Sequence, residues 1–315
     1  MRRLAVLAAL PLLFAAACGG NNGDVTAKTG ASPTGVKVAG EFGKKPQVTF
    51  PAGKPPATSS AQTISEGQGN VVKDGDAVVA NLTAYSWDGK SNAASGSTYD
   101  DGAPQLIKVD SKLPSVVHKA FQDSKPGGRF VAVVAKDSLT ADQVEQAKSQ
   151  GADTSIASVY VVDVMGVPTA KAAQGTATDP AVKGVTLENP GGDQAPKLTT
   201  KTSESAPKGL VAKTVIKGSG PVVKTGQTIL VHYTGKIWGS DSEFDSSWSR
   251  GEPVMFPIGV GKVIKGWDQS LVGVPVGSRV LVSIPPDLGY GKAGSGDKIK
   301  GTDTLVFVVD VLGAY

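Results

Sequence analysis

The stretch "VIKGWDQSLVGVPVGSRVLVSIPPDLGYG", residues 263–291, says most about the fold of the C-terminal part of the chain. It predicts a short helix from Lys265 to Leu271, because Gly273 and Pro275 then stop helical structure. A β-branched run follows within the same stretch, and strand-type alternation recurs in "QTILVHYTGKIW" and "TDTLVFVVDVL". These patterns predict an α+β unit in which a bent antiparallel β-sheet packs on a short helix.

The chain contains an internal duplication. The segment "EGQGNVVKDGDAVV" from Glu66 recurs as "KGSGPVVKTGQTIL" from Lys217, and "YVVDVMG" from Tyr160 recurs as "FVVDVLG" from Phe307. Segments that recur in the same order at a nearly constant offset indicate copies of one structural unit. We therefore expect two tandem units with the same fold.

The duplication sets the expected domain boundaries. The two copies cover residues 35–166 and 184–315. Between them, residues 167–183 are small and polar without periodic apolar positions, which predicts a flexible linker. Residues 18–34 have a similar composition and are predicted to be a flexible tether.

The N-terminal residues have the pattern of an export signal. Arg2 and Arg3 precede an apolar run too short to span a bilayer, so residues 1–17 are predicted to be a signal peptide. The "AAAC" that ends at Cys18 resembles the lipobox of bacterial lipoproteins, which implies lipidation of Cys18. A free thiol is the alternative for this cysteine, the only one in the chain. We expect a lipid-anchored protein on the extracytoplasmic face of the cell membrane.

Charge and motif spacing argue against several function classes. The formal net charge of +4 falls to +2 without residues 1–17, so no nucleic-acid partner is expected. His232 is the only candidate base of the second unit and is interpreted as structural, and no His or Cys pair has metal-ligand spacing. The glycines of "GYGKAGSG" lead into a loop instead of a helix. We therefore expect no metal and no cofactor.

The second unit instead concentrates aromatic and a few polar side chains. If Tyr233 and Phe307 lie on the inward faces of their strands, both point toward the helix that begins near Trp267. Such a cluster could be ordinary core, but buried tyrosine hydroxyls and charges need partners, so a pocket is the other interpretation. The cluster comprises Tyr233, Phe244, Asp245, Arg250, Phe256, Trp267, Tyr290 and Phe307.

At these residues the chain resembles the FKBP-type peptidyl-prolyl isomerases. The matching segments are "VHYTGKIW", "FDSSWSRGEPVMFPIG", the stretch quoted first and "TLVFVVDVL", in that family's order between residues 209 and 312. The resemblance implies that Trp267 is the floor on which a substrate proline ring rests. It implies a catalytic set of Tyr233, Phe244, Asp245, Trp267, Tyr290 and Phe307, and a substrate-binding set of Arg250, Val254, Phe256, Val263 and Ile264.

The resemblance also implies particular polar roles. Asp245 would meet the polar side of a ligand, with Arg250 paired to it. The Tyr290 hydroxyl and the backbone N–H of Ile264 would donate hydrogen bonds to the substrate.

The chain departs from the family pattern at the rim of the implied pocket. Val254 stands where an aromatic residue is common, and Ser295 where a histidine is frequent. The segment "DKIKG", residues 297–301, replaces a more apolar loop. The rim should therefore be more polar than is usual in the family. The resemblance also implies macrolide inhibitors as candidate ligands of this chain.

The first copy lacks part of the implied site. Leu82 and Val117 stand where the second unit has its first tyrosine and its tryptophan floor. Tyr99 and Asp100 align with the Phe-Asp pair, and Tyr160 aligns with the last phenylalanine. The segment "KDSLTADQVEQAKSQGAD" replaces the second tyrosine loop and predicts an added helix. We expect unit 1 to keep the fold, to have little or no isomerase activity, and to serve as a spacer or a binding module.

The leading hypothesis is a peptidyl-prolyl cis-trans isomerase that acts on X-Pro bonds of exported proteins. Desolvation and distortion of the amide in the aromatic pocket would suffice, because no covalent bond breaks. The expected partners are proline-containing unfolded or secreted polypeptides, and we expect a monomer. The alternative is a non-catalytic extracytoplasmic lipoprotein that binds peptides or proteins.

Overall fold

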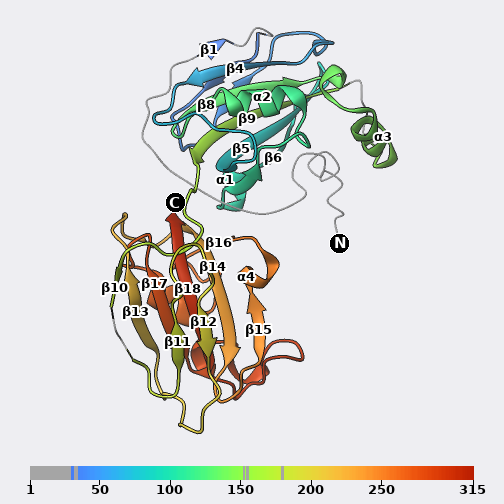
Figure 1. The fold of residues 1–315 in the computed structure, drawn as a ribbon. Helices are drawn as coiled ribbons and strands as arrows, with labels where there is room; N and C mark the ends of the chain where they lie inside the picture. The colour runs from blue at the N-terminus through green and yellow to red at the C-terminus, as the bar shows by residue number, and fades with distance from the viewer. Residues whose placement is uncertain (1–29, 32–34, 152, 154–155, 179–180) are drawn as a thin grey trace. The chain divides into compact units, whose positions relative to one another are not determined.

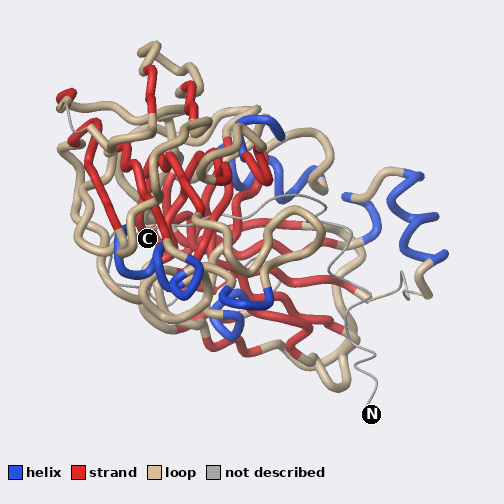
Figure 2. The backbone as a smooth tube through the Cα atoms, turned by 90° about the horizontal axis from the view of Figure 1, so that it is seen from below, coloured by secondary structure: helices blue, strands red, loops and turns tan. Residues whose placement is uncertain are grey.

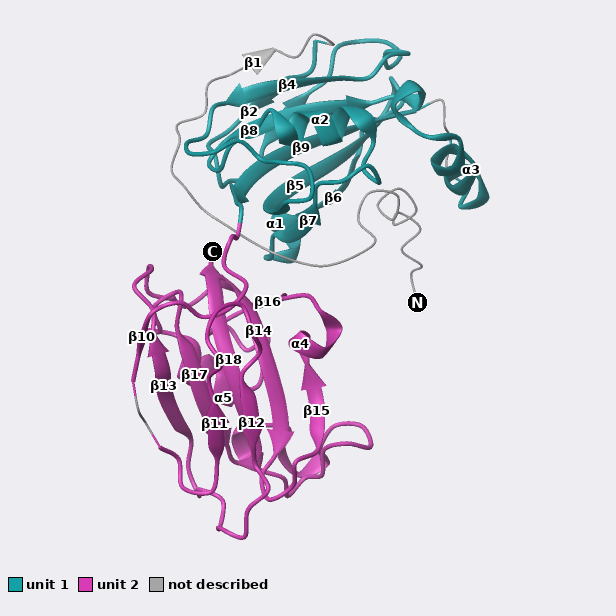
Figure 3. Ribbon diagram, in the orientation of Figure 1, with its two compact units in different colours: residues 1–167 teal, residues 168–315 magenta. Residues whose placement is uncertain are grey.

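The computed structural model describes residues 30–31, 35–151, 153, 156–178 and 181–315. The chain forms two compact units, residues 1–167 and 168–315 (Figure 3). The predicted signal peptide and Cys18 lie outside the described residues, as does most of the predicted tether. No helix in the described ranges is long and apolar enough to cross a membrane.

Unit 2 is an antiparallel sheet (Figure 1) with a short helix across one face. In spatial order the strands are β10 (Thr176–Ala177), β13 (Val211–Lys217), β17 (Arg279–Ile284), β18 (Leu305–Ala314), β14 (Thr228–Ile237) and β15 (Glu243–Ser246), with β16 (Val254–Pro257) also paired to β14. The helical segments are α4 (Ser247–Arg250), α5 (Lys265–Leu271), η2 (Pro286–Leu288) and η3 (Gly291–Ala293). The predicted α+β fold is confirmed.

The helix α5 begins and ends where the sequence predicts. Asp268 in its first turn accepts the backbone N–H groups of Gly259, at 2.6 Å, and Gly261, at 2.8 Å, which fixes the preceding turn. A side chain at Gly266 would lie 2.5 Å from Ile284, so only glycine lets α5 approach strand β17 this closely. After α5, Gly273 has φ +87°, a left-handed conformation that glycine adopts at little cost.

A β-hairpin covers the other face of the unit 2 sheet. It consists of β11 (Thr186–Glu188) and β12 (Lys197–Thr199). Leu198 of this hairpin packs in an apolar cluster with Leu281 of β17 and Val308 of β18. The sheet is therefore buried on both faces, by α5 on one and by the hairpin on the other, which matches the nearly continuous apolar runs of its central strands.

Unit 1 repeats this architecture. Its sheet order is β4 (Ser60–Ser65), β8 (Arg129–Val134), β9 (Ala157–Gly166), β5 (Ala77–Trp87) and β6 (Ala94–Ser97), with β7 (Gln105–Lys108) also on β5. The hairpin is β2 (Lys37–Ala39) and β3 (Gln47–Thr49), with β1 (Gly30–Ala31) paired to β2. The helical segments are α1 (Thr98–Asp101), α2 (Ser115–Gln122), η1 (Lys136–Ser138) and α3 (Ala141–Ser149), so the added helix is confirmed. Strands dominate the described parts of both units, as Figure 2 shows.

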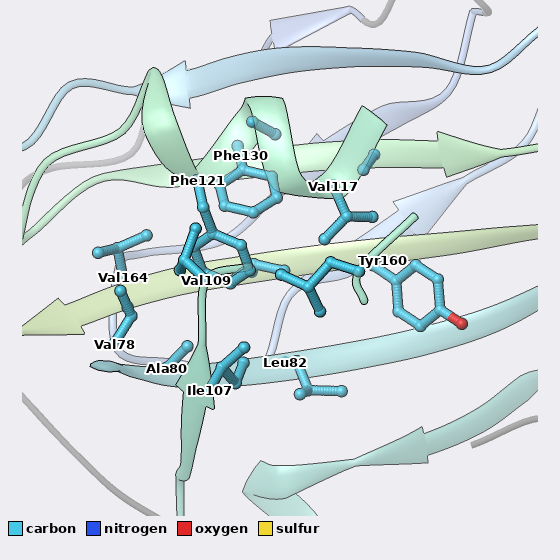
Figure 4. Packing of buried hydrophobic residues seen from close by; sticks show 14 of the residues in the cluster. Val78, Ala80, Leu82, Ile107, Val109, Val117, Phe121, Phe130, Tyr160 and Val164 are labelled. Atoms are coloured by element: carbon cyan, nitrogen blue, oxygen red, sulfur yellow. The ribbon is translucent and has the colours of Figure 1, made fainter. Parts of the chain in front are cut away.

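Strand register places the two copies in correspondence. Leu82 pairs with Val162 in unit 1, and Tyr233 pairs with Val309 in unit 2. Figure 4 shows Val117 of α2 and Leu82 of β5 among the aliphatic side chains that fill the core of unit 1. The alignment of Leu82 with Tyr233 is therefore confirmed by the structure.

Each unit contains one buried ion pair at the same place. Arg129 pairs with Asp163, and Arg279 pairs with Asp310, across equivalent neighbouring strands; all four side chains are almost completely buried. Such a pair is tolerated in the core only when further hydrogen bonds satisfy it.

Those further hydrogen bonds come from the hairpin side of each unit. In unit 1, Arg129 donates to the backbone carbonyls of Gly40, Glu41 and Lys44 at 2.8–2.9 Å. In unit 2, Arg279 donates to the Asn189 side chain at 2.9 Å. The ion pair thereby ties the hairpin to the sheet in both units.

Part of the segment expected to be a flexible linker is ordered against unit 2. The backbone N–H of Ala173 donates to Asp310 at 2.8 Å, and that of Gln174 donates to the Gly277 carbonyl at 2.8 Å. Strand β10 then extends the sheet along the edge of β13. A run of small residues suits this edge, because a side chain at Gly175 would lie 2.1 Å from the Lys217 carbonyl.

Candidate active site

A cavity of about 620 Å³ opens on the α5 face of unit 2. It is walled by side chains from the sheet, from the turn that precedes α5, from α5 itself and from the loop after β17. This volume lies in the range of small-molecule and peptide side-chain sites. The lining residues are Tyr233, Phe244, Asp245, Phe256, Gly261, Lys262, Val263, Ile264, Lys265, Trp267, Gly289, Tyr290 and Phe307.

Trp267 is surrounded by three aromatic rings that meet its indole edge to face. The centroids of Tyr233, Phe256 and Phe307 each lie 5.3 Å from that of Trp267, at interplanar angles of 80–90°. Trp267 is 4% exposed, and its Nε1 has no hydrogen-bond partner among the described residues. The indole therefore contributes apolar ring surface to the cavity, and the three neighbouring rings fix its orientation.

A glycine makes room for the far wall. Gly235 of β14 lies beneath the rings of Phe244 and Phe307, which pack edge to face with centroids 5.4 Å apart. A Cβ at Gly235 would lie 2.6 Å from Phe244 and 2.8 Å from Phe307. Any larger residue at this position would push these rings toward the cavity.

A network of three side chains forms the polar corner of the cavity. Asp245 accepts hydrogen bonds from the Tyr233 hydroxyl and from Arg250, and Arg250 also lies 3.1 Å from the Tyr233 oxygen. Burial opposes ionisation of Asp245, but hydrogen bonds from Tyr233 and Arg250 outweigh it, so the pKa of this carboxyl lies below its usual value. Burial, with the hydrogen bond to Asp245, raises the pKa of Tyr233 to about 12. The corner is therefore a neutral, hydrogen-bonded group near pH 7.

Two hydrogen-bond donors at the cavity remain available. Tyr290 is 41% exposed at the mouth, and no hydrogen bond within the described ranges uses its hydroxyl. Burial of its ring, with the charge of Asp245, raises the pKa of Tyr290, which keeps this hydroxyl protonated. The backbone N–H of Ile264 likewise donates to no described group, so both can donate to a ligand carbonyl.

Comparisons with known proteins match this unit. The profile of the FKBP-type peptidyl-prolyl cis-trans isomerases matches residues 220–312. The FK506-binding protein of Streptomyces anulatus is 46% identical over 107 residues, which cover 34% of this chain and 86% of that protein. The chain belongs to the FKBP-type peptidyl-prolyl cis-trans isomerase family.

Two further proteins are similar to this unit. A probable FK506-binding protein of Corynebacterium glutamicum is 40% identical over 109 residues, covering 35% of this chain and 90% of the relative. The crystal structure of FkpA from Escherichia coli shares 39% identity, covers 35% of this chain and 50% of that chain, and has a TM-score of 0.32. The chain is an FKBP-type peptidyl-prolyl cis-trans isomerase.

The structure brings most of the sequence-predicted FKBP site together. All six residues predicted as catalytic line the cavity, as do Phe256, Val263 and Ile264 from the substrate-binding set. Arg250 does not line it and reaches it only through Asp245 and Tyr233. Val254 pairs with Val231 on strand β14, packs against the core and does not line the cavity.

Sequence reasoning missed four lining residues. Gly261, Lys262, Lys265 and Gly289 line the cavity beside the predicted set. The two lysines flank the Val-Ile pair in "GKVIKG", and this adjacency is the only sequence feature that connects them with the site. By themselves, lysines in an exposed turn do not indicate a cavity.

Unit 1 lacks the FKBP site more completely than its sequence indicates. Thr83 pairs with Ser97 as Thr234 pairs with Ser246, so Tyr99 corresponds to Trp248. The predicted alignment of Tyr99 and Asp100 with the Phe-Asp pair is therefore wrong. Both hairpins carry a bulge at the equivalent step, so the correspondence is set by which residues pair across each hairpin, and the sequence alone does not show this pairing.

The residues that do stand in those places are small. By the same register Ser95 and Gly96 of unit 1 replace Phe244 and Asp245 of unit 2. Tyr99 instead donates its hydroxyl to the buried Asp163 and belongs to the ion-pair cluster. Unit 1 therefore has neither the aromatic wall nor the polar corner.

His232 is structural, as predicted. Its Nδ1 lies 2.9 Å from the Ser247 hydroxyl, and its ring stacks on Trp248 with centroids 4.0 Å apart. Ser247 is completely buried, so this pair cannot reach a substrate. Burial, opposed by the charge of Asp310, lowers the pKa of His232 to about 4, which keeps the imidazole neutral. No cluster of metal-ligating residues occurs in the part of the chain that the structure describes.

Proposed function

We propose that unit 2 isomerises X-Pro bonds of exported, incompletely folded polypeptides, and that unit 1 contributes no catalysis. The supporting observation is the cavity whose floor is Trp267 with three rings standing against it. A pyrrolidine ring is compact and apolar and fits such a box. The two unused donors beside it would hold the peptide carbonyls.

The chemistry requires little from the protein. An X-Pro amide rotates over a barrier of about 18–20 kcal/mol, and no covalent bond is made or broken. The planar amide is stabilised by charge separation between nitrogen and oxygen, which is lost in the twisted transition state. A site that removes water from the carbonyl therefore favours the twisted state over the planar one. The donors that would hold the carbonyl are the Tyr290 hydroxyl and the Ile264 N–H, and the corner of Tyr233, Asp245 and Arg250 adds no net charge beside them.

The place of action is inferred from the N-terminal sequence alone. A signal peptide at residues 1–17 and a lipidated Cys18 would hold the protein at the outer face of the cell membrane, where secreted chains fold. Two acyl chains give stable anchoring where one does not. Cell fractionation should find the chain with membranes, and a Cys18→Ser variant in the soluble fraction; equal partition of both would contradict the anchor.

The experiment for catalysis compares the loss of two different tryptophan side chains, one in the cavity and one outside it, within the full chain. Isomerisation of a capped Ala-Leu-Pro-Phe peptide, followed by NMR exchange, should be accelerated by the unsubstituted chain. Trp267→Ala should lower kcat/KM by about tenfold or more, because the floor is lost. Trp238→Ala is the matched control: this indole donates to the Glu204 carbonyl at 2.9 Å on the hairpin face. No acceleration by the unsubstituted chain, or equal loss in both variants, would overturn the proposal in favour of a binding protein.

A further inference from the structure

The mouth of the cavity carries lysines that have no counter-charge. Lys262 and Lys265 line the cavity on either side of Val263 and Ile264, and both are exposed. None of the ion pairs formed among the described residues involves either lysine. Lys298, from the loop that departs from the family pattern, donates to the Phe244 carbonyl at 3.0 Å.

The nearby carboxylates are already used. Asp245 is the only acidic residue of the cavity lining, and it is bound by Tyr233 and Arg250. Asp268 faces the turn and accepts two backbone N–H groups there. Asp287 and Asp297 are exposed in the loops on the Tyr290 side and form no ion pair with these lysines. Within the described residues, no carboxylate therefore forms an ion pair with Lys262 or Lys265.

The fold does not require these lysines. Lys265 is the first residue of α5, where a cation is disfavoured by the positive end of the helix dipole. Lys262 lies in an exposed turn whose conformation is held by Asp268 through the neighbouring glycine. Their common property is that both face the site where the chain flanking a bound proline must pass.

We propose that Lys262 and Lys265 make this FKBP site selective for prolines flanked by aspartate or glutamate. The proposal rests on the proposed isomerase function of unit 2. The lysines would attract the acidic side chain in the bound peptide and in the transition state alike. Such uniform binding lowers KM more than it raises kcat. It would also fall with ionic strength, since the Debye length shortens from about 10 Å at 0.1 M salt to about 3 Å at 1 M, and exposed ion pairs weaken accordingly.

The test uses peptides that differ in one charge. In capped peptides without other charges, glutamate, glutamine or lysine is placed before the proline in one series and after it in another. With the full chain at low salt, we expect kcat/KM for the preferred glutamate peptide to exceed that of its glutamine partner roughly three- to fivefold, mostly through KM, as is typical of exposed ion pairs. The lysine peptide should be worse than the glutamine peptide. At 0.5 M salt the differences should nearly vanish.

Variants assign the effect to the lysines. The double change Lys262→Gln with Lys265→Gln should remove the glutamate preference, while Lys262→Arg with Lys265→Arg should retain it. Lys213→Gln is the matched control: Lys213 pairs with Leu281, which packs in the hairpin-side cluster, so it lies on the opposite face of the sheet. This control should keep the preference unchanged.

The outcomes separate the two proposals. Equal rates for glutamate and glutamine peptides in both series, or a preference that survives the double glutamine variant, would overturn the specificity while leaving isomerase function intact. A chain that accelerates none of the peptides would instead overturn the isomerase function of unit 2.

Discussion

The two units share a framework and differ in what fills it. Both have the same strand order, a helix on one face, a hairpin on the other and a buried Arg-Asp pair that ties the hairpin down. In unit 2 an aromatic cavity opens under the helix, whereas unit 1 has Leu82 and Val117 of its core at the positions of Tyr233 and Trp267. The framework residues and the site residues are therefore separable, and the first set has been kept where the second is missing.

The missing cavity of unit 1 is replaced by packed core. Where unit 2 has Leu271 and Val280, unit 1 has Phe121 and Phe130, whose rings meet edge to face with centroids 5.1 Å apart. The phenylalanine rings of unit 1 lie in the core under the helix, whereas the aromatic rings of unit 2 lie around the cavity. Val117 of α2 is 2% exposed and lies within this packed core (Figure 4).

The largest expected effect tests the shared framework. Asp163→Ala should lower the free energy of unfolding of unit 1 by about 3–5 kcal/mol, and Asp310→Ala should do the same in unit 2, because each leaves a buried arginine without its partner. Hydrogen exchange with mass spectrometry on the full chain would read each unit separately. Glu145→Ala, which breaks the exposed pair with Lys148, should change little. A loss below about 1 kcal/mol in either unit would show that the ion pair is not a common support.

The next effect is a loss of stability at low pH that we expect in unit 2 and not in unit 1. Folded His232 binds a proton only near pH 4, against an ordinary value of 6.5, so the unfolded chain holds more protons between these values. This contribution to unit 2 stability is fully present above about pH 6.5 and is lost as the pH falls toward 4. Its size is on the order of 3 kcal/mol, since each unit of pKa is worth about 1.4 kcal/mol.

Unit 1 provides the control for this pH dependence. Asn81 occupies the position of His232, with its oxygen 2.8 Å from the Thr98 hydroxyl as His232 is 2.9 Å from that of Ser247. Unit 1 should lack this loss, and His232→Asn should remove it from unit 2. Thermal unfolding followed unit by unit from pH 7 to 4 measures both, and parallel losses in the two units would contradict the assignment to His232.

The smallest expected effect on stability comes from a substitution of Gly235, which lies under the rings of Phe244 and Phe307. The same substitution should have a larger effect on catalysis. Gly235→Ala should cost about 1–3 kcal/mol through overpacking against Phe244 and Phe307, and should lower kcat/KM about tenfold as the rings move into the cavity. Unit 1 has Ala84 at this position, where Ser95 replaces Phe244 and Tyr160 replaces Phe307. Ala84→Gly should cost about 0.5–1 kcal/mol and leave isomerisation unchanged. Peptide isomerisation and chemical denaturation would measure both; full activity of the Gly235 variant would contradict the steric role.

Much of the fold could be predicted because its signals are local and repeated. The limits of α5 follow from Gly273 and Pro275, and the long strands follow from apolar alternation. The outer hairpins and β10 were missed because strands of two or three residues carry no period. Helix α4 was missed because a single turn capped by Ser246 has no apolar repeat.

The site was predictable only in part. Aromatic residues marked the cavity because few occur elsewhere in unit 2, and their strand alternation gave the correct face. Lys262 and Lys265 were not found, since exposed lysines resemble any solvated turn until the cavity beside them is known. The partner of Tyr99 was also hidden, because its position depends on which residues pair between β5 and β6, and the sequence alone does not show this pairing.

Strand β10 determines where a fragment that contains unit 2 alone should begin. A fragment cut at the sequence repeat, starting at Gly184, would lose the strand that shields the rim of β13 and the amide that caps Asp310. An exposed edge strand has unpaired backbone donors and acceptors that can pair with a strand of another chain, so such a fragment should self-associate. A cut just after Val167 would preserve that covering.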